Sequence, residues 1–517
     1  MAIAVMIAVV AAAGGYAIHL RRAAEQRIEL VGRLRGLAPE LRTLLRSAKM
    51  LPRHDIRPAR ETVRGTMRDV EHKLQTPAGE AERAVISFVL GEGHRALGDH
   101  DQALALLEAA WTAGERGPPI DAALGYALGA SYWERLQQIE STVAADERAA
   151  AIRTIETRYR DPAMVHLRAA LVARASSPTY LEALIAFHEH RFADASRGAQ
   201  AAFTESPTFY EAGVLEARAR HEAGRVLLTG DKREEATQAF AEARRIFERV
   251  LEIARSDDEA WLGYGEMVYV QAHDLAKGSL PVEMRQQAID AFRTVREINP
   301  ERWEAILSEV TIYEHEANLA IVWYQDPRPH VEKVLATANE ARAHGAAADR
   351  VDTVICLAHW ARAVYEGTHG VDPRPEFERA AAACERATEV KPDADKHSSL
   401  GVVYATLATY DAEHGGEPDR AFERGERSFR ASLAIREDAV QRYNLGRLWS
   451  AFAHYQSGHG RDPARAVEAA LAELQTAVRM DATRSDALAA IGDVLVARAR
   501  FQLAAQADVQ ATIAEAR

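Results

Sequence analysis

A short motif recurs at a fixed interval in the C-terminal half of the chain, and this periodicity constrains the fold more than any other feature. "HGVDPRPEF" begins at His369, "HGGEPDRAF" at His414 and "HGRDPARAV" at His459, so each copy follows the previous one by 45 residues. A chain of 517 residues is several times the usual domain size, so it is either a string of domains or an array that grows by repetition. The recurrence favours the array.

A second pattern, of small and apolar residues, runs in the same phase. A small residue or valine is followed by an apolar residue four positions later, a small residue or valine three positions after that, and an end position five positions further on that is polar, proline or alanine. The pattern ends at Arg255, Pro300, Ala346, Pro392, Glu437 and Ala482, at steps of 45, 46, 46, 45 and 45 residues. Six matches in phase predict a repeating unit of two packed helices. We expect Ala387 to lie at the contact between paired helices and Glu376 to be exposed.

The repeated loop predicts where one helix ends and the next begins. Its glycine suits the left-handed conformation that terminates a helix, and the preceding histidine falls in the last helical turn. The acidic residue and the proline that follow suit the N-cap and the first position of the next helix. These residues are His369, Gly370, Asp372 and Pro373, with equivalents at His414, Gly415, Glu417 and Pro418 and at His459, Gly460, Asp462 and Pro463.

Three further segments resemble the tetratricopeptide repeat. "SFVLGEGHRALGDHDQALALLEAAWTAG", from residue 87 to residue 114, has the spacing of a helical hairpin, and "RYNLGRLW" at 442–449 contains an Asn-x-Gly typical of a first helix. Trp261 and Gly265 match the Trp-x2-Leu-Gly of the family, with Tyr264 in place of leucine. The resemblance implies an all-α, tetratricopeptide-like solenoid of helical hairpins, in units of about 45 residues in the C-terminal half instead of the usual ~34.

The resemblance also implies a function. Solenoids of hairpins bind protein or peptide segments along a concave groove formed by their first helices, so the chain is expected to be an interaction scaffold. Tyr443, Asn444 and Arg447 are the expected groove residues, with Asn444 and Arg447 holding a peptide backbone or a carboxylate. The alternative is that these are ordinary solvated polar positions.

The first 20 residues, "MAIAVMIAVVAAAGGYAIHL", contain no Asp, Glu, Lys or Arg, which predicts a transmembrane anchor. A cleaved signal peptide is the alternative. Residues 21–73 carry 14 Lys plus Arg against 7 Asp plus Glu. This basic flank favours a single-pass membrane protein with its array in the cytoplasm, and an extracytoplasmic array is the alternative. The expected organisation is an anchor at 1–20, a basic helical stalk at 21–75, hairpins at 76–210 and regular repeats at 211–517.

A narrower resemblance points to a second function. Four strings resemble the C-terminal helical region of myxobacterial-type serine/threonine protein kinases: "LPRHDIRPARETVRGTMRDVE", "GEGHRALGDHDQALALLEAAW", "YRDPAMVHLRAAL" and "SPTYLEALIAFHEHRFADA". The resemblance implies the regulatory or sensor half of such a kinase, without its catalytic domain. It also favours the extracytoplasmic alternative, because that region follows a cytoplasmic catalytic domain and a membrane segment.

No catalytic chemistry is visible in the sequence. It contains no GxxxxGK[ST], HExxH, GxSxG or GxGxxG motif, so we expect no enzyme activity and no cofactor. Cys356 and Cys384 have no partner pattern and are interpreted as small core residues rather than as a disulfide or a metal site. The three repeated histidines are too far apart, at about one repeat, to share one metal ion. Outside residues 21–73 the net charge is -19, which disfavours nucleic acid as a partner.

Overall fold

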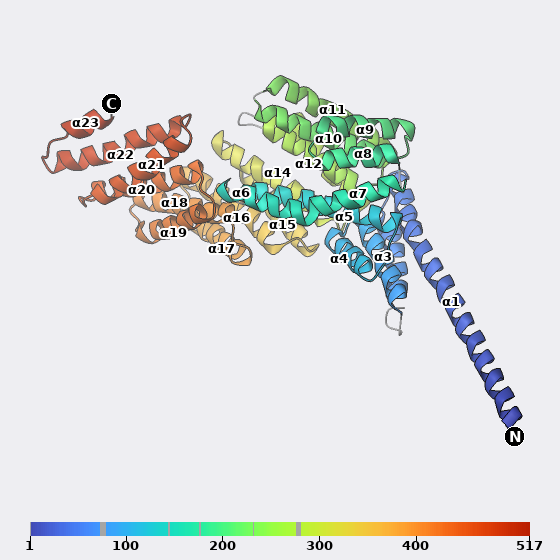
Figure 1. Cartoon of the computed structure of the whole chain (residues 1–517). Coiled ribbons are helices and arrows are strands. Elements are labelled where there is room, and N and C mark those ends of the chain that lie inside the picture. The colour runs from blue at the N-terminus through green and yellow to red at the C-terminus, as the bar shows by residue number, and fades with distance from the viewer. Residues whose placement is uncertain are drawn as a thin grey trace. The chain divides into compact units, whose positions relative to one another are not determined.

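The structure, a computed structural model, is built of helices. It describes residues 2–72, 79–142, 145–174, 177–230, 232–275 and 281–516, and these ranges contain no strand (Figure 1). The prediction of an all-α fold is confirmed. The chain divides into two compact units, which we call unit 1 (Met1–Gln137 and Ile152–Pro300) and unit 2 (Gln138–Ala151 and Glu301–Arg517).

Unit 1 contains the N-terminal helices of the chain. They are α1 (Ala2–Met50), α2 (Arg57–His72), α3 (Glu80–Leu97), α4 (His100–Thr112), α7 (Asp161–Val172), α8 (Pro178–His188), α9 (Phe192–Glu205), α10 (Tyr210–Thr229), α11 (Arg233–Ile253), α12 (Asp258–Leu275) and α13 (Val282–Ile298). The division between the units falls within α5 (Pro118–Thr142) and α6 (Ala145–Ile155), and a π-helical turn, η2 (Glu156–Arg160), joins α6 to α7. Consecutive helices pack as hairpins in the pairs α3 with α4, α8 with α9, α10 with α11 and α12 with α13.

Unit 2 contains the regular repeats. Its helices are α14 (Trp303–Val322), α15 (Arg328–Ala343), α16 (Ala348–Thr368), α17 (Arg374–Val390), α18 (Ala394–Glu413), α19 (Asp419–Ile435), α20 (Ala439–Gly458), α21 (Ala464–Met480), α22 (Ser485–Ala504) and α23 (Gln510–Ala516). Each even-numbered helix from α14 to α20 forms a hairpin with the helix that follows it. The even-numbered helices, which we call the first helices, also contact one another in order from α14 to α22. Each repeat therefore packs against its neighbours in sequence, as a solenoid requires.

A close contact between a glycine and a large side chain sets the spacing of many hairpins. A Cβ atom placed on Gly91 of α3 would lie 2.8 Å from Leu107 Cγ of α4. In α12, a Cβ on Gly265 would lie 2.5 Å from a ring carbon of Phe292. Such distances are shorter than carbon–carbon contact allows, so only glycine lets the two helices approach this closely. These glycines therefore determine how closely the two helices of a hairpin approach each other.

The loops between the helices of unit 2 end the first helices as predicted. Gly370, Gly415 and Gly460 have φ values of 76°, 72° and 67°, in the left-handed region. The next helix begins one residue later than expected, because Pro373 is the N-cap of α17 and Arg374 its first residue. Asp372 still caps this helix, since its Oδ1 accepts a hydrogen bond of 3.2 Å from the Arg374 backbone N–H.

The prediction of a membrane-anchored protein is contradicted. Within the part of the chain that the structure describes, no helix is both long enough and apolar enough to cross a bilayer. Residues 2–20 of the predicted anchor at 1–20 belong to α1, and most side chains of this stretch lie outside the described part. Placing the array on either side of a membrane depended on that anchor, so both placements are withdrawn with it.

The later part of α1, from Leu34 onward, packs against other helices of unit 1. Its apolar residues Leu34, Ala38, Leu41 and Leu45 recur every three or four positions and are almost completely buried, and α1 packs against α3. Arg42 Nη1 lies 2.7 Å from a carboxylate oxygen of Glu92, whose side chain is fully buried. This stretch is therefore a packed element of unit 1.

Two expectations about α16 and α17 are wrong. Cys356 and Cys384 form a disulfide that links the two helices. Glu376 is buried rather than exposed, because it faces α16, where His359 Nδ1 lies 2.6 Å from its Oε2. Arg379 and Arg362 also pair with this carboxylate. Both errors concern contacts between helices, which a pattern read along one helix does not contain.

Candidate functional site

Helix α20 carries the three residues predicted to bind a partner. Asp438 caps its start, with Oδ1 accepting hydrogen bonds from the backbone N–H groups of Val440 at 2.7 Å and Gln441 at 3.2 Å. Gly446 then allows close packing on α21, since a Cβ there would lie 2.6 Å from Leu474 Cγ. Because the Gly446 face of α20 packs on α21, the residues on the other faces of α20 contact other elements or solvent.

Tyr443 and Arg447 lie one turn apart on α20 and contact each other. The Arg447 guanidinium carbon is 5.9 Å from the centre of the Tyr443 ring, and Arg447 is exposed. The described residues offer Arg447 no ion-pair partner, whereas neighbouring Arg442 is paired with Glu437 at 2.7 Å and Glu473 at 2.6 Å. The hydrogen bond to Glu437 is the main cause that raises the pKa of Arg442. Arg447 is thus an exposed cation held over an aromatic ring, and its N–H groups remain available for an acceptor.

A second guanidinium completes the surroundings of Tyr443. Arg484, in the loop before α22, lies 4.7 Å from the centre of the same ring and is paired with Asp486 at 2.6 Å. No sequence pattern indicated this contact, because Arg484 does not belong to the repeated loop motif. Asn444 is half-buried beside Tyr443. Together the tyrosine, the carboxamide and the exposed guanidinium present both hydrogen-bond donors and acceptors, and a guanidinium can pair with a carboxylate through two parallel hydrogen bonds.

Polar side chains join consecutive first helices on both sides of α20. Ser398 of α18 donates to Gln441 Oε1 of α20 at 2.5 Å, and Ser450 of α20 donates to Asp493 Oδ2 of α22 at 3.1 Å. Further along the row, Trp360 Nε1 of α16 donates to Thr406 Oγ1 of α18 at 3.1 Å. These bonds fix the register of adjacent first helices, so the side chains of different repeats hold constant positions along one row.

The three repeated histidines have a structural role. His369, His414 and His459 each place Nδ1 within 2.8 to 2.9 Å of the carbonyl oxygen of a tyrosine one turn earlier, so Nδ1 carries the proton and donates. The centres of the three imidazole rings lie 4.0 to 4.3 Å from the centres of those tyrosine rings. Among the described residues no group of three His, Cys, Asp or Glu side chains is placed to hold a metal ion.

The packing defines a class of protein, an α-helical repeat protein with hairpins of the tetratricopeptide type. Solved structures similar to it include a thermophilic tetratricopeptide repeat protein of Thermus thermophilus, with 18% identity, a TM-score of 0.31, and 46% of this chain and 100% of that chain covered. A tetratricopeptide repeat protein of Parabacteroides merdae has 11% identity and a TM-score of 0.36, covering 62% and 98%. Yeast Tom70 has 12% identity and a TM-score of 0.32, covering 85% and 92%. No protein-family model and no curated protein sequence matches this chain.

Proposed function

We propose that unit 2 is a protein-interaction scaffold that binds an extended peptide segment along its first helices, with Tyr443, Asn444 and Arg447 as contact residues. The observation that carries this proposal is Arg447, an exposed guanidinium that lies over Tyr443 and makes no ion pair within the described part of the chain. A cation on an aromatic ring favours a carboxylate, which pairs with the guanidinium through two parallel hydrogen bonds. The preferred ligand is therefore a segment with an acidic side chain or a free C-terminus.

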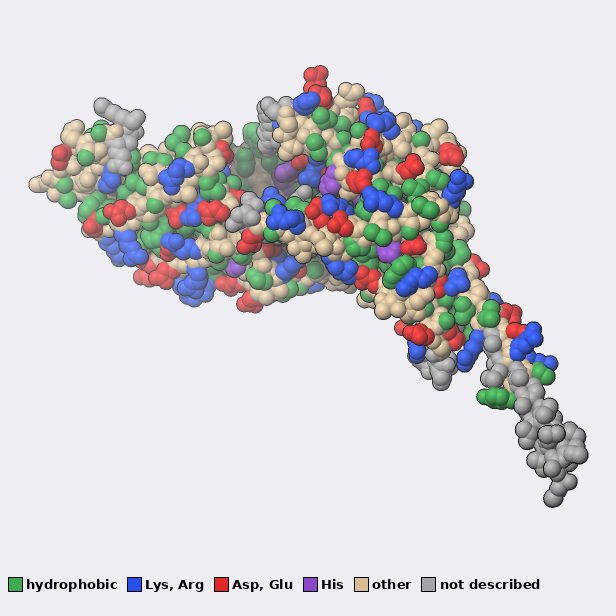
Figure 2. Space-filling view, viewed as in Figure 1, with side chains coloured by type: hydrophobic (Ala, Val, Ile, Leu, Met, Phe, Trp, Pro, Cys, Tyr) green, Lys and Arg blue, Asp and Glu red, His purple; other side chains and the backbone are tan. Residues whose placement is uncertain are grey.

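The charge of the surface fits such a partner better than a nucleic acid. Figure 2 shows acidic and basic side chains interspersed over the visible face, whereas nucleic-acid binding needs a continuous basic stripe. Arg447 is a single exposed guanidinium, so it favours a local negative charge such as one carboxylate rather than a long polyanion.

Peptide display tests the proposal. A library of random peptides with free C-termini is selected on the full chain, and the dissociation constants of the selected peptides are measured for the natural protein and three variants. Arg447→Ala is expected to weaken binding about 10-fold, because a hydrogen-bonded ion pair is lost. Tyr443→Ala and Asn444→Ala are expected to weaken it less.

Arg465→Ala is the matched control. Arg465 is an exposed arginine on α21, a second helix, so its removal changes the charge by the same amount away from the first helices. It is expected to leave binding within about 2-fold of the natural protein. Selected peptides that bind Arg447→Ala and the natural protein equally well count against the proposed site.

The regulatory half of a serine/threonine kinase is the second proposal, and only the sequence resemblance favours it. The strings that carry the resemblance fall in unit 1. They lie at the loop before α2 and α2 itself, at α3 with α4, at the turn into α7, and at α8 with α9. The DNA upstream of the Met1 codon tests this proposal. A kinase catalytic domain in the same reading frame supports it, and an intervening stop codon contradicts it.

A further inference from the structure

Cys356 and Cys384 occupy the positions at which other hairpins place a glycine against a large side chain. Cys356 lies 45 residues before Gly401, and Cys384 lies 45 residues before Phe429. A Cβ on Gly401 would be only 2.7 Å from Phe429 Cδ1, so α18 and α19 approach closely at this level. The hairpin of α16 and α17 has neither the glycine that permits this approach nor the large side chain that fills the space beside it.

The disulfide joins α16 and α17 at the position where the next hairpin has a glycine packed against a large side chain. The Cα atoms of Cys356 and Cys384 are 5.3 Å apart, within the usual range for a disulfide, and the two residues are 0% and 1% exposed. The bond therefore joins α16 and α17 at the level where the next hairpin packs Phe429 against Gly401.

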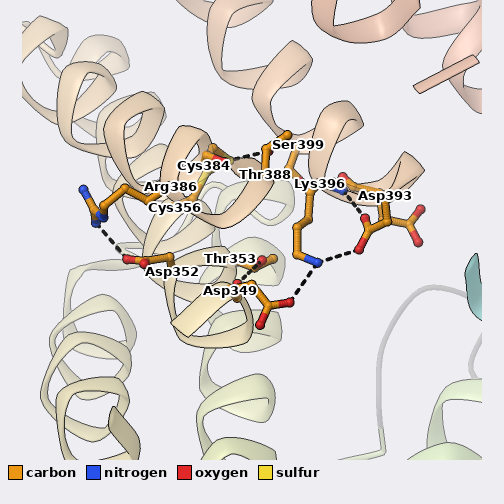
Figure 3. The surroundings of a disulfide bond; sticks show 11 residues. Asp349, Asp352, Thr353, Cys356, Cys384, Arg386, Thr388, Asp393, Lys396 and Ser399 are labelled. Atoms are coloured by element: carbon orange, nitrogen blue, oxygen red, sulfur yellow. Dashed lines mark hydrogen bonds and ion pairs between the residues drawn. A yellow bond between two sulfur atoms is a disulfide. The ribbon is translucent and has the colours of Figure 1, made fainter. Parts of the chain in front are cut away.

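Ion pairs hold the same helices in register around the disulfide (Figure 3). On one side, Arg386 of α17 lies 2.8 Å from Asp352 of α16. On the other side, Lys396 of α18 lies 3.1 Å from Asp349 of α16 and 2.6 Å from Asp393. Desolvation of the Lys396 ammonium opposes its ionisation, but the two carboxylates outweigh this effect and raise its pKa. The two cysteines thus face each other within a framework of charge pairs that positions α16 against both neighbours.

We propose that the disulfide between Cys356 and Cys384 acts as a redox-dependent staple, which replaces the glycine–aromatic contact of the neighbouring repeats and sets the stability of the hairpin of α16 and α17. The bond forms by thiol–disulfide exchange with a disulfide of low molecular weight, such as oxidised glutathione. The thiolate of one cysteine attacks the disulfide and releases one thiol, and the second thiolate then attacks the mixed disulfide and releases the other. The chain loses two protons and two electrons, and the exchanging disulfide gains them as two thiols.

The burial of both sulfur atoms determines at which stage of folding the thiol–disulfide exchange occurs. Because neither sulfur is accessible in the packed hairpin, the bond closes before α16 and α17 have packed, or during a local opening of the pair. Once the hairpin is packed, the bond is protected from reductants. The oxidised and reduced chains are therefore two states that exchange slowly, and the reduced state has the weaker hairpin.

The test compares the full chain refolded from denaturant with oxidised glutathione and with an excess of a phosphine reductant. Each sample is then denatured in iodoacetamide and weighed intact by mass spectrometry. The oxidised chain is expected to take up no carbamidomethyl group and the reduced chain to take up two. The reduced chain is expected to melt at a temperature lower by roughly 5 to 10 °C, because a closed loop no longer limits the unfolded chain.

Two double variants distinguish the contribution of the disulfide to stability from that of side-chain packing. Cys356→Gly with Cys384→Phe copies the pair in the next hairpin and is expected to melt near the oxidised natural chain, with or without reductant. Cys356→Ala with Cys384→Ala removes the bond without replacing the contact, so it is expected to melt like the reduced chain. Two carbamidomethyl groups on the chain refolded with oxidised glutathione, or equal melting temperatures of the oxidised and reduced natural chain, overturn the proposal.

Discussion

At the scale of single residues, Tyr324 is the clearest departure from the repeated loop. It lies in the turn after α14 with φ 54°, and it is 96% exposed. Counted by the repeat, its position is that of Gly370 in the next loop, which has φ 76°. A side chain in the left-handed region costs about 1 to 2 kcal/mol, and an exposed ring has little packing to offset that cost.

Tyr324→Gly is therefore expected to stabilise unit 2 by about 0.5 to 1 kcal/mol, since the relief of strain exceeds the greater freedom that glycine gives the unfolded chain. Trp323→Gly is the control, because Trp323 is also an exposed aromatic residue but has an ordinary φ of -94°. It is expected to be neutral or destabilising. Urea unfolding measures both, and a lower midpoint for Tyr324→Gly than for the natural chain contradicts the assignment of strain.

At the scale of elements, the contact between the helices of one hairpin limits what a repeat tolerates. Ala387 on α17 is 1% exposed and lies on the buried face of the helix together with Cys384 and Ala380. This position was predicted from the repeated pattern, and the structure confirms it. The exposed control position on the same helix is Ala382.

Ala387→Trp is expected to lower the free energy of unfolding by about 1 to 3 kcal/mol, because an indole overfills a close contact between helices. Ala382→Trp introduces the same side chain on the solvent face of α17 and is expected to change stability by less than about 0.5 kcal/mol. Chemical denaturation followed by circular dichroism distinguishes the two variants. Equal denaturation midpoints for Ala387→Trp and Ala382→Trp would mean that the buried and exposed faces of α17 are wrongly assigned.

At the scale of the whole molecule, each unit carries a titratable group whose pKa is shifted by burial, and these two groups respond to pH in opposite directions. In unit 1, burial lowers the pKa of His188 to about 3, with Arg218 and His190 adding to the effect. The ring stays neutral and accepts a 3.1 Å hydrogen bond from Trp133 Nε1. In unit 2, burial raises the pKa of Glu314 to about 7, against a hydrogen bond from Asn318 that lowers it.

The signs follow from which state of each unit binds more protons. A histidine pKa that falls on folding stabilises the folded unit above about pH 6.5, and this stability is lost as the pH falls toward 3. A glutamate pKa that rises on folding stabilises the folded unit fully below about pH 4.5, and this stability is lost as the pH rises through 7. Lowering the pH from 7.5 to 5 is therefore expected to weaken the packing around His188 and to strengthen the packing around Glu314.

Hydrogen exchange at these two pH values, corrected for the intrinsic exchange rates, measures the effect in each unit separately. Protection of α8 is expected to fall at pH 5, whereas that of α14 is expected to rise by about 1 to 2 kcal/mol, a figure reduced because Glu314 is partly exposed. Glu314→Gln removes the charge and is expected to leave α14 equally protected at both values. A rise that persists in Glu314→Gln excludes this carboxyl as its cause.

The sequence by itself determined the features that depend on neighbouring residues. The 45-residue period, the helical class, the glycine that ends each first helix and the buried position of Ala387 all follow from spacing along one or two turns of chain. These features recur in successive repeats, so each copy adds evidence for the same interpretation of the sequence. The candidate residues Tyr443 and Arg447 were placed on one helix by the resemblance of "RYNLGRLW" to a first helix of the tetratricopeptide repeat.

Only the tertiary structure decided which faces of different helices meet. The bond between Cys356 and Cys384, the burial of Glu376 against His359, and the contact of Arg484 with Tyr443 join residues on separate elements. The packing of α1 from Leu34 onward is of the same kind, because it depends on where α3 lies. Spacing along one helix determines which residues share a face, whereas the approach and rotation of two packed helices determine what that face touches.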